Sequence, residues 1–341
     1  MTLLQIIWFW LLIALAAGYV VLDGYDLGTG FWYIFARNKD DRAAMLNSIT
    51  PFWDGNEVWL VTAGGALFAA FPAVYATVFS TFYLPFILIL FALIARASSI
   101  VMREQGYSER WNRFWNFAFC FGSLLPAILF GVAAGNLLKG LEIDAKGNFT
   151  GSVIDLLNPY SLLIGFTNLA LMAVHGALWI KLKTLDELSI KALKWARISY
   201  IVFVLLLSVS IIETIKNIPG ILDNYITLPA YMIFPAIFLT AIIFEGLMIF
   251  LKSKMDKLLF AISSIKIIAL FGTLGASAFP TLVPSLNNAQ NTLTAANSSS
   301  SPLTLKIMFI ITAIFLPIVI SYTYYVHKLF GGKVTPEDAH Y

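Results

Sequence analysis

Nine long apolar stretches dominate this sequence of 341 residues and leave few choices of fold. Each is about 20 residues long or more, the length that an α-helix needs to cross the hydrocarbon core of a membrane. The sequence does not show the alternation of apolar and polar residues that is typical of transmembrane β-barrel strands. We therefore predict an all-α polytopic membrane protein, one integral membrane domain over 1–341, with spans near 3–34, 52–71, 74–100, 112–138, 159–180, 196–217, 228–251, 258–280 and 304–330.

The composition agrees with a membrane protein. Hydrophobic residues make up 59% of the chain, charged residues 12%, and the mean hydropathy is +0.82. A soluble domain averages about 25% charged residues. The net charge of +3 is small and the basic residues lie between spans, so nucleic acid is not an expected partner. The first apolar run lacks a basic segment before it and exceeds a signal peptide in length, so we expect a retained first span.

The basic residues decide the span count and the orientation. Segments between spans carry, on alternate sides, seventeen and four Lys or Arg residues, with Lys266 left inside a span. This bias predicts nine spans, with the N-terminus outside and the C-terminus in the cytoplasm. The second span is the least apolar at its start, where Asp54 and Glu57 lie, and Pro72 closes it, so eight spans are the alternative. Leaving this span out would break the alternation of basic residues between the two sides of the membrane. Residues 284–302 are polar and low in complexity, and we expect a mobile outer loop.

Two acidic pairs are the first functional candidates. Asp23 and Asp26, and then Asp54 and Glu57, are each spaced i,i+3, so both members of a pair point to nearly the same side of a helix. A carboxylate at membrane depth costs about 2.5–3.5 kcal/mol, so these groups must face protein, a partner or water. The predicted topology places both pairs near the cytoplasmic leaflet, where four converging carboxylates would form a path for protons or cations.

A purely structural network is the alternative for these acids. In that interpretation Asp54 caps the second helix, and Asp23 or Asp26 pairs with Arg37 or Arg96.

Five further polar residues fall inside predicted spans. Glu245 and Lys266 are candidates for a buried pair or for relay members, and Glu213 with Lys216 fits an i,i+3 pair at an interface. His175 is the one deeply placed histidine.

The chain offers few ligands for a metal or haem. No second intramembrane histidine accompanies His175, because His327 lies at a helix end and His340 in the tail. The single cysteine, Cys120, excludes an internal disulfide, a cysteine zinc site and a cysteine-ligated iron–sulfur cluster. We therefore expect no metal and no haem held by this chain.

Four sequence segments carry a resemblance to a known family. The chain resembles subunit II of cytochrome bd-type quinol oxidases, most specifically over residues 18–103. The segments are DGYDLGTG (23–30), NSITPFWDGNEVWL (47–60), TAGGALFAAFPAVYATVFSTFY (62–83) and LFALIARASSIVMR (90–103).

The resemblance implies a fold, a reaction and partners. The family fold is two four-helix bundles plus one peripheral helix. The partner is a larger subunit I with haem d, two haems b and the quinol site, and small single-span accessory subunits can join the complex. The complex oxidises quinol and reduces dioxygen to water in the bacterial inner (cytoplasmic) membrane. Family members can also hold a structural quinone in subunit II, whereas catalysis by the isolated chain is not expected.

The resemblance also implies residue roles. Asp54 would belong to a cytoplasmic hydrophilic channel toward the haems of subunit I, with Asp23, Asp26 and Glu57 near the same mouth, and Trp59 would line an apolar oxygen path. The alternative from another class is a proton-coupled secondary transporter with the carboxylates as coupling sites. Such a transporter would be expected to show broken helices in two matching halves, whereas the acids here cluster in the first two spans.

Overall fold

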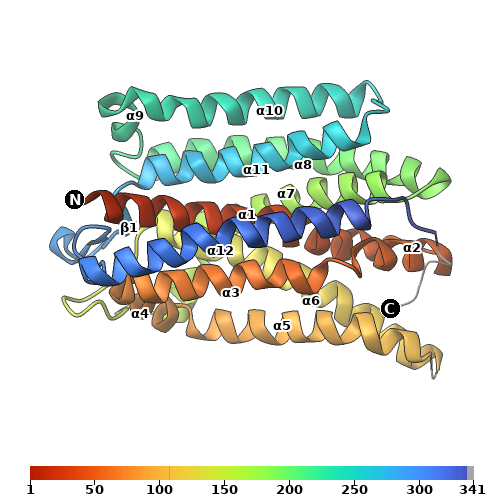
Figure 1. Cartoon of the computed structure of the whole chain (residues 1–341), viewed down its shortest axis with the longest axis horizontal. Coiled ribbons are helices and arrows are strands. Elements are labelled where there is room, and N and C mark those ends of the chain that lie inside the picture. The colour runs from red at the N-terminus through yellow and green to blue at the C-terminus, as the bar shows by residue number, and fades with distance from the viewer. Residues whose placement is uncertain (107, 336–341) are drawn as a thin grey trace.

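A computed structural model describes residues 1–106 and 108–335 of the chain, and its long helices run side by side across the molecule (Figure 1). The tail with His340 lies outside the described residues. The structural elements are α1 (Leu3–Tyr33), α2 (Lys39–Ile49), α3 (Trp53–Ala70), α4 (Pro72–Thr81), α5 (Tyr83–Met102), η1 (Arg103–Gln105), α6 (Glu109–Lys139), η2 (Val153–Leu157), α7 (Pro159–Lys183), α8 (Asp186–Asn217), α9 (Asp223–Thr227), η3 (Pro229–Met232), α10 (Ile233–Phe250), α11 (Asp256–Ala278), β1 (Thr281–Val283), η4 (Ala289–Asn291), β2 (Leu293–Thr294) and α12 (Pro302–Leu329).

Within the described residues, eight helices are long and apolar enough to cross a membrane: α1, α5, α6, α7, α8, α10, α11 and α12. The all-helical polytopic membrane architecture is therefore confirmed. Eight of the nine predicted spans have a counterpart among these helices. The exception is the predicted span at 52–71, which corresponds to α3, a helix of 18 residues whose first turn is polar.

The predicted span at 74–100 was wrong in its extent. The structure divides it between α4 and α5, with the break at Phe82, and the membrane-length helix begins at Tyr83. Pro85 explains the break, because proline has no N–H to donate to the carbonyl of Thr81 one turn earlier. Pro72 likewise begins α4 at the first helical position, where a missing N–H is tolerated.

Helix α2 is an element that the sequence analysis missed. Asn38 caps its N-terminus by accepting a hydrogen bond from the backbone N–H of Asp41 at 2.6 Å. Asp40 and Asp41 lie in the first turn, where negative charge is favourable. One face is apolar and buried, with Met45 and Ile49 fully buried. A helix of 11 residues is too short to span, and it lies at one end of the molecule (Figure 1).

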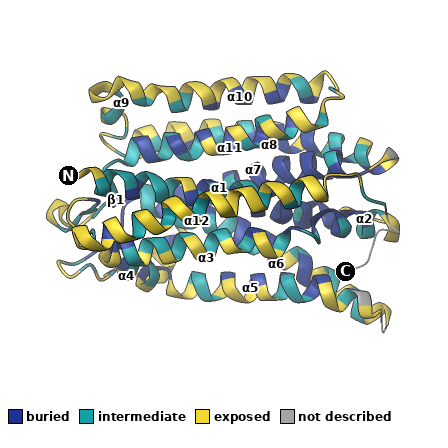
Figure 2. Ribbon diagram, viewed as in Figure 1, coloured by how far each residue is buried: buried dark blue, intermediate teal, exposed yellow. Residues whose placement is uncertain are grey.

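Helices α1 and α7 form the centre of the fold. Figure 2 shows buried residues concentrated along them, whereas α10 and α12 are mostly exposed. The two helices approach closely at Gly28 and Gly176: a Cβ on Gly28 would lie 2.0 Å from the carbonyl oxygen of Met172. Only glycine permits this contact, because a methyl group there would collide with the α7 backbone.

The basic segments gather at one end of the molecule, with α2 and the described end of the chain (Figure 1). Lys191 pairs with Asp41 at 3.0 Å, and Lys333 donates to the carbonyl of Thr184 at 2.9 Å. We call this the basic end. Arg96 does not belong to it: the charge count placed Arg96 between spans, whereas the structure buries it inside α5.

The opposite end carries the N-terminus, α4, α9 and β1 (Figure 1). Residues 284–302, expected to be a mobile loop, instead form part of an ordered substructure in which β1 pairs antiparallel with β2. Val283 and Ala295 are buried in an apolar cluster here, and asparagine side chains add hydrogen bonds around it; Asn291, for example, donates to the carbonyl of Ile143 at 2.9 Å. In the neighbouring loop, hydrogen bonds from the backbone and side chain of Asn148 hold the pKa of the exposed Asp144 below its usual range.

Candidate functional site: a buried acid cluster at α1, α3 and α5

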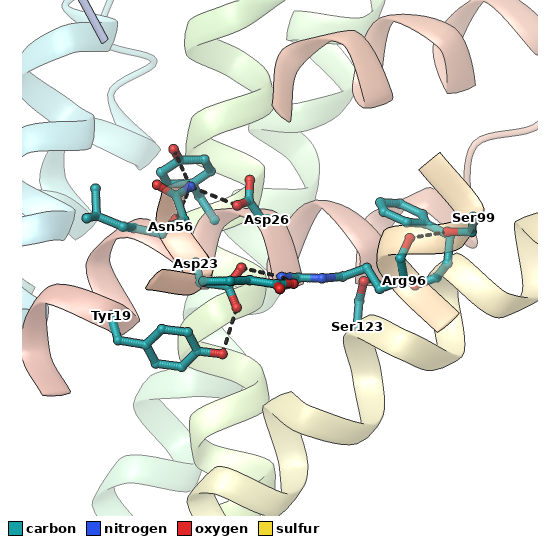
Figure 3. Close-up of polar contacts among 11 residues, drawn as sticks. Tyr19, Asp23, Asp26, Asn56, Arg96, Ser99 and Ser123 are labelled. Atoms are coloured by element: carbon teal, nitrogen blue, oxygen red, sulfur yellow. Dashed lines mark hydrogen bonds and ion pairs between the residues drawn. The ribbon is translucent and has the colours of Figure 1, made fainter. Parts of the chain in front are cut away.

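Asp23 is the centre of a polar cluster in an otherwise apolar core (Figure 3). Its side chain is fully buried on α1. One carboxylate oxygen accepts from the hydroxyl of Tyr19, one turn earlier, at 2.7 Å, and the other accepts from Arg96 of α5 at 2.6 Å. Figure 3 shows Tyr19 and Arg96 reaching Asp23 from different directions. Both oxygens are thus held by protein donors, one from α1 and one from α5.

Arg96 joins two of the predicted acids through a single nitrogen. Its Nη2 lies 2.6 Å from Asp23 Oδ1 and 2.6 Å from Glu57 Oε1. The guanidinium is completely buried, whereas the Glu57 side chain is 24% exposed. Because arginine stays protonated in proteins, the cluster always contains one positive charge. The pairing of Asp23 with Arg96 that the sequence allowed is therefore present, together with a second carboxylate.

Asp26 is connected to α3 through an amide rather than a cation. Asn56 Nδ2 lies 2.8 Å from Asp26 Oδ2, 2.8 Å from the Tyr25 hydroxyl and 3.1 Å from the carbonyl of Leu22. Figure 3 shows Asn56 and Asp26 facing each other beside Asp23. These hydrogen bonds hold the polar start of α3 against α1.

Several polar atoms of the cluster have no protein partner within the described part of the chain. They are Asp26 Oδ1 and two nitrogens of Arg96, Nε and Nη1, and all three are buried. Buried polar groups are nearly always hydrogen-bonded to protein or to ordered water. Water can hydrogen-bond to all three atoms, and Asp26 Oδ1 can in addition take up a proton.

Asp54 is not part of the buried cluster. Its side chain is exposed on α3, and no hydrogen bond or ion pair joins it to another described residue. The predicted convergence of four carboxylates is thus corrected to three, Asp23, Asp26 and Glu57, with Asp54 on the outer face. A side-chain cap at the start of α3 is also absent, so the alternative role of Asp54 as a helix cap is wrong. The reason is register: α3 turns Asn56 and Glu57 inward and Asp54 outward.

Trp59 packs between α1 and α3. A Cβ on Gly18 would lie 2.5 Å from Cε3 of the indole, so the missing side chain at Gly18 makes room for the ring. The next residues, Leu60 and Val61, line a large apolar cleft of about 1500 Å³ bordered by α1, α3, α5, α6 and α11.

Glu245 and Lys266 form a second buried ion pair, on α10 and α11, with 2.5 Å between Oε2 and Nζ. Both side chains are completely buried, and the ammonium also lies 4.9 Å from the ring centre of Phe203. The buried-pair interpretation of these residues is present in the structure. The expected pair of Glu213 and Lys216 is present too, at 3.5 Å on the surface.

The geometry of His175 fits a structural role better than ligation of haem. Nε2 donates to the carbonyl of Val21 at 2.9 Å, which leaves Nδ1 to accept from the hydroxyl of Ser263 at 2.9 Å. The ring also stacks on Phe260. Both nitrogens are therefore engaged by protein. Among the residues that the structure describes, no group of three or more His, Cys, Asp or Glu side chains is placed to hold a metal ion.

Sequence reasoning missed four members of this network. Tyr19 and Asn56 bond to the acids directly, Tyr25 bonds to Asn56, and His327 contacts Tyr25. Tyr19 precedes Asp23 by four residues, a spacing that places both on one helix face and could have indicated the contact. No comparable signal pointed to His327, whose contact with Tyr25 joins positions 302 residues apart.

Comparison with known proteins decides the family. The model of the family described as "Cytochrome bd terminal oxidase subunit II" matches residues 4–330. This chain belongs to that family. The sequence is 34% identical to "Cytochrome bd ubiquinol oxidase subunit 2" of Bacillus subtilis, over 99% of each chain. It is 32% identical to "Cytochrome bd-I ubiquinol oxidase subunit 2" of Escherichia coli, over 98% of this chain and 96% of that protein.

The fold agrees with this family assignment. A chain of the bd oxidase from Geobacillus thermodenitrificans matches with a TM-score of 0.78, over 96% of this chain and 99% of that chain, at 16% sequence identity. The resemblance found in the sequence is thus confirmed. The chain is a subunit of a terminal oxidase, a multi-pass protein of the bacterial inner membrane, and the transporter alternative is not favoured.

Proposed function

We propose that this chain works in a quinol-oxidising, dioxygen-reducing complex by carrying protons from the cytoplasm to its partner, subunit I. The observation that carries the proposal is the position of Arg96, which ties the buried Asp23 to the partly exposed Glu57. Glu57 lies three residues after the exposed Asp54. A line of acidic groups thus leads from the core of α1 to the outer face of α3. The haems d and b belong to subunit I in this proposal.

The exposed position of Asp54 supports a partner on this face. A carboxylate facing lipid costs about 2.5–3.5 kcal/mol at membrane depth. Val58 and Val61, on the same helix, are 53% and 74% exposed and make the surrounding surface apolar. A subunit that covers this face would bury the apolar surface and give Asp54 a polar neighbour. In this arrangement Asp54 is the last acid of this chain before subunit I.

Each acid has its own task in the proposed path. The pair of Asp23 and Arg96 keeps the start of the path polar. Asp26 has one oxygen without a protein partner, so it can bind and release a proton through water. Glu57 reaches toward solvent from the same cluster, and Asp54 passes the proton outward. Carboxyl groups within reach of one another and of water are what proton relays in membranes are built from.

We propose α3 as the ninth span. Its first turn bonds to Leu22 and Asp26 of α1, and its last residue, Ala70, accepts from the backbone of Ser300. Its 18 residues extend for about 27 Å at 1.5 Å per residue, close to the roughly 30 Å of the hydrocarbon core. In Figure 1, α3 runs between the end that holds α2 and the end that holds α4. The basic end is then cytoplasmic, with the N-terminus outside.

The helices can then be grouped as two four-helix bundles with α12 outside them. Hydrogen bonds or ion pairs link α1 to α3, α5 and α6 in one group. In the other group they link α7 to α8, α8 to α10, α10 to α11 and α11 to α7. Helix α12 contributes only Leu305 to the buried residues among those described.

The apolar cleft of about 1500 Å³ is our candidate for the structural quinone. Rings of Phe9, Phe86 and Phe130 line it, and the hydrophobic side chains suit an isoprenoid tail. The cleft extends to the end of the molecule that carries β1, since Thr281 and Leu282 also border it. We assign this group no part in proton transfer.

The test of the proton path is Asp54→Asn in the assembled complex. The variant keeps the shape and hydrogen-bonding capacity of the side chain but cannot titrate, so quinol oxidase turnover per haem should fall by about tenfold or more. The haem spectrum should not change, because Asp54 lies far from any haem ligand in the proposal. Turnover would be measured in membranes at equal haem content.

Glu142→Gln is the matched control, because Glu142 is an exposed acid in the loop at the opposite end of the molecule. It should leave turnover unchanged. Normal turnover per haem in Asp54→Asn, with or without a reduced yield of complex, would show that Asp54 is scaffolding and would remove the proposed path.

A further inference from the structure

His327 lies in the last turn of α12, at the basic end, and touches the acid cluster through α1. Its Nε2 is 3.1 Å from the hydroxyl of Tyr25. Its Nδ1 is 2.9 Å from the carbonyl of Thr323, one turn earlier on the same helix. A carbonyl only accepts, so Nδ1 carries a hydrogen and the neutral ring accepts from Tyr25 at Nε2. Nε2 is thus the nitrogen at which His327 gains or loses a proton.

Tyr25 continues the contact into the buried cluster. Its hydroxyl lies 2.8 Å from Asn56 Nδ2, the same nitrogen that lies 2.8 Å from Asp26 Oδ2. Two contacts to one atom place the Tyr25 and Asp26 oxygens no more than about 5.6 Å apart, a gap that one water can bridge. Asp26 also keeps its second oxygen without a protein partner among the described residues.

Burial changes along this series of side chains. Asp26 is completely buried and Tyr25 is 1% exposed, whereas His327 is only partly buried. Tyr25 is held in place by stacking on Trp179, with ring centres 4.0 Å apart. His327 is held by Phe52, with ring centres 4.6 Å apart. The path from the partly exposed imidazole to the buried carboxyl is therefore fixed by aromatic packing at two points.

We propose that His327 is a proton-relay side chain that loads Asp26 from the basic end, acting through Tyr25. The inference rests on the proposed proton path and adds its first member. Histidine suits this place, because its ordinary pKa near 6.5 lets it exchange protons at physiological pH.

Protons are conserved at each step. The imidazolium of His327 gives the proton at Nε2 to the Tyr25 oxygen, Tyr25 gives its own hydroxyl proton to the water that bridges to Asp26, and that water gives one of its protons to the Asp26 carboxylate. The tyrosine ends as a neutral hydroxyl, the imidazole as the neutral Nδ1–H form, and Asp26 as the carboxylic acid. A further proton from the aqueous side restores the imidazolium.

The charges around His327 act in opposite directions. The ammonium of Lys183, on α7, lies 5.4 Å from the centre of the Phe52 ring, and His327 packs against the same ring. Because like charges repel, Lys183 disfavours the positively charged imidazole. Asp26 of α1, beyond Tyr25, favours it when ionised. Asn56 of α3 and Trp179 of α7 do not titrate in this range, and Lys328, next in the chain, is exposed.

The test compares three variants of the complete oxidase: His327→Gln, Tyr25→Phe and Lys328→Gln. Glutamine keeps a polar group near Tyr25 but cannot carry a proton, and phenylalanine keeps the stacking on Trp179 but removes the hydroxyl. Lys328→Gln is the control, since it removes a titrating group one residue away from the relay. Quinol oxidase turnover per haem would be recorded from pH 5.5 to 8.5, in H2O and in D2O.

We expect His327→Gln and Tyr25→Phe to lower turnover per haem at least about threefold. Both variants should lose the part of the pH profile that reflects titration of the imidazole, and both should show a larger solvent isotope effect. Lys328→Gln should behave as the parent complex does. A merely structural role for His327 would reduce the yield or the thermal midpoint of the complex but leave the pH profile per haem unchanged.

An unchanged pH profile in His327→Gln would overturn the inference. If Asp54→Asn is nevertheless slow in that case, the proton path stands and only its first member is wrong. If Asp54→Asn is also normal, the path itself is wrong. The two failures are therefore separable in one set of membranes.

Discussion

The two buried ion pairs of this chain differ in their access to water, and this difference separates function from support. Arg96 is shared by two carboxylates, one of which is partly exposed, and two of its nitrogens have no partner among the described residues. Glu245 and Lys266 are sealed from the surface: both side chains are at 0% exposure, although Glu245 Oε1, like the two Arg96 nitrogens, has no hydrogen-bond partner among the described residues. The partly exposed Glu57 thus gives the first group a route to solvent, and no partly exposed acid is bound to the second pair among the described residues. We therefore interpret Glu245 and Lys266 as a support for the α10–α11 contact.

This interpretation predicts non-additive effects at the sealed pair. Glu245→Gln or Lys266→Met alone leaves an uncompensated or unsatisfied buried group, and breaking such a pair costs about 3–5 kcal/mol. The yield and thermal midpoint of the complex should fall in both single variants. The double variant with Glu245→Leu and Lys266→Met should recover much of the loss, because well-packed hydrophobic residues can replace a buried pair.

Turnover per haem is the deciding measurement for these variants. It should equal the parent value in whatever complex assembles. A lowered turnover per haem at normal yield in Glu245→Gln would instead assign the pair to a proton relay.

At the scale of the elements, the contact between α1 and α7 decides how the helices are arranged around the cluster. The backbones meet at Gly28 and Gly176, where a Cβ on Gly176 would lie 2.3 Å from the carbonyl carbon of Gly28. Gly24, one turn earlier on α1, is different: its nearest neighbours would be 3.8–3.9 Å from an added Cβ, an ordinary contact distance. Only one of the two glycines in this small-residue pair is therefore needed for the approach.

Gly28→Ala should consequently prevent or strongly reduce assembly of the oxidase, whereas Gly24→Ala should be tolerated. The added methyl at position 28 would meet the Met172 carbonyl oxygen at 2.0 Å, and backbone cannot rotate away as a side chain can. The measurement is the haem-containing complex recovered per cell mass for each variant. Equal recovery of both would mean that α1 and α7 can separate without penalty, contrary to the packing described here.

Sequence patterns predicted the helices better than their side-chain partners. Hydropathy located eight of the spans, because the length of an apolar run is a local property. It failed at Phe82, where a missing N–H at Pro85 breaks the helix inside a continuous apolar run. It also failed at α2, whose burial depends on other elements. The inward register of Asn56 and the contact of Tyr25 with His327 are tertiary features that no local pattern contains.

At the scale of the whole molecule, the polar groups of the proposed path occupy only one side of the membrane. His327 and α2 lie at the basic end, and the acid cluster lies deeper on α1 and α3, whereas the apolar cleft borders β1 at the opposite end. Protons entering from the basic end need not cross the whole bilayer in this chain. The oxidase would then take up protons on the cytoplasmic side if the basic end is cytoplasmic.

That orientation, and the crossing of α3, can be tested together by labelling single cysteines in a Cys120→Ser background. Asp40→Cys lies in the first turn of α2, and Lys146→Cys lies in the loop between α6 and α7, both at exposed positions. Three helices, α3, α5 and α6, separate these positions if α3 crosses, so an odd number of crossings should place them on opposite sides. A membrane-impermeant thiol reagent should label position 146 in intact cells and position 40 only in inverted vesicles. Labelling of both from the same side would mean that α3 does not cross, and labelling of position 40 alone in intact cells would reverse the orientation and with it the direction of the proposed proton path.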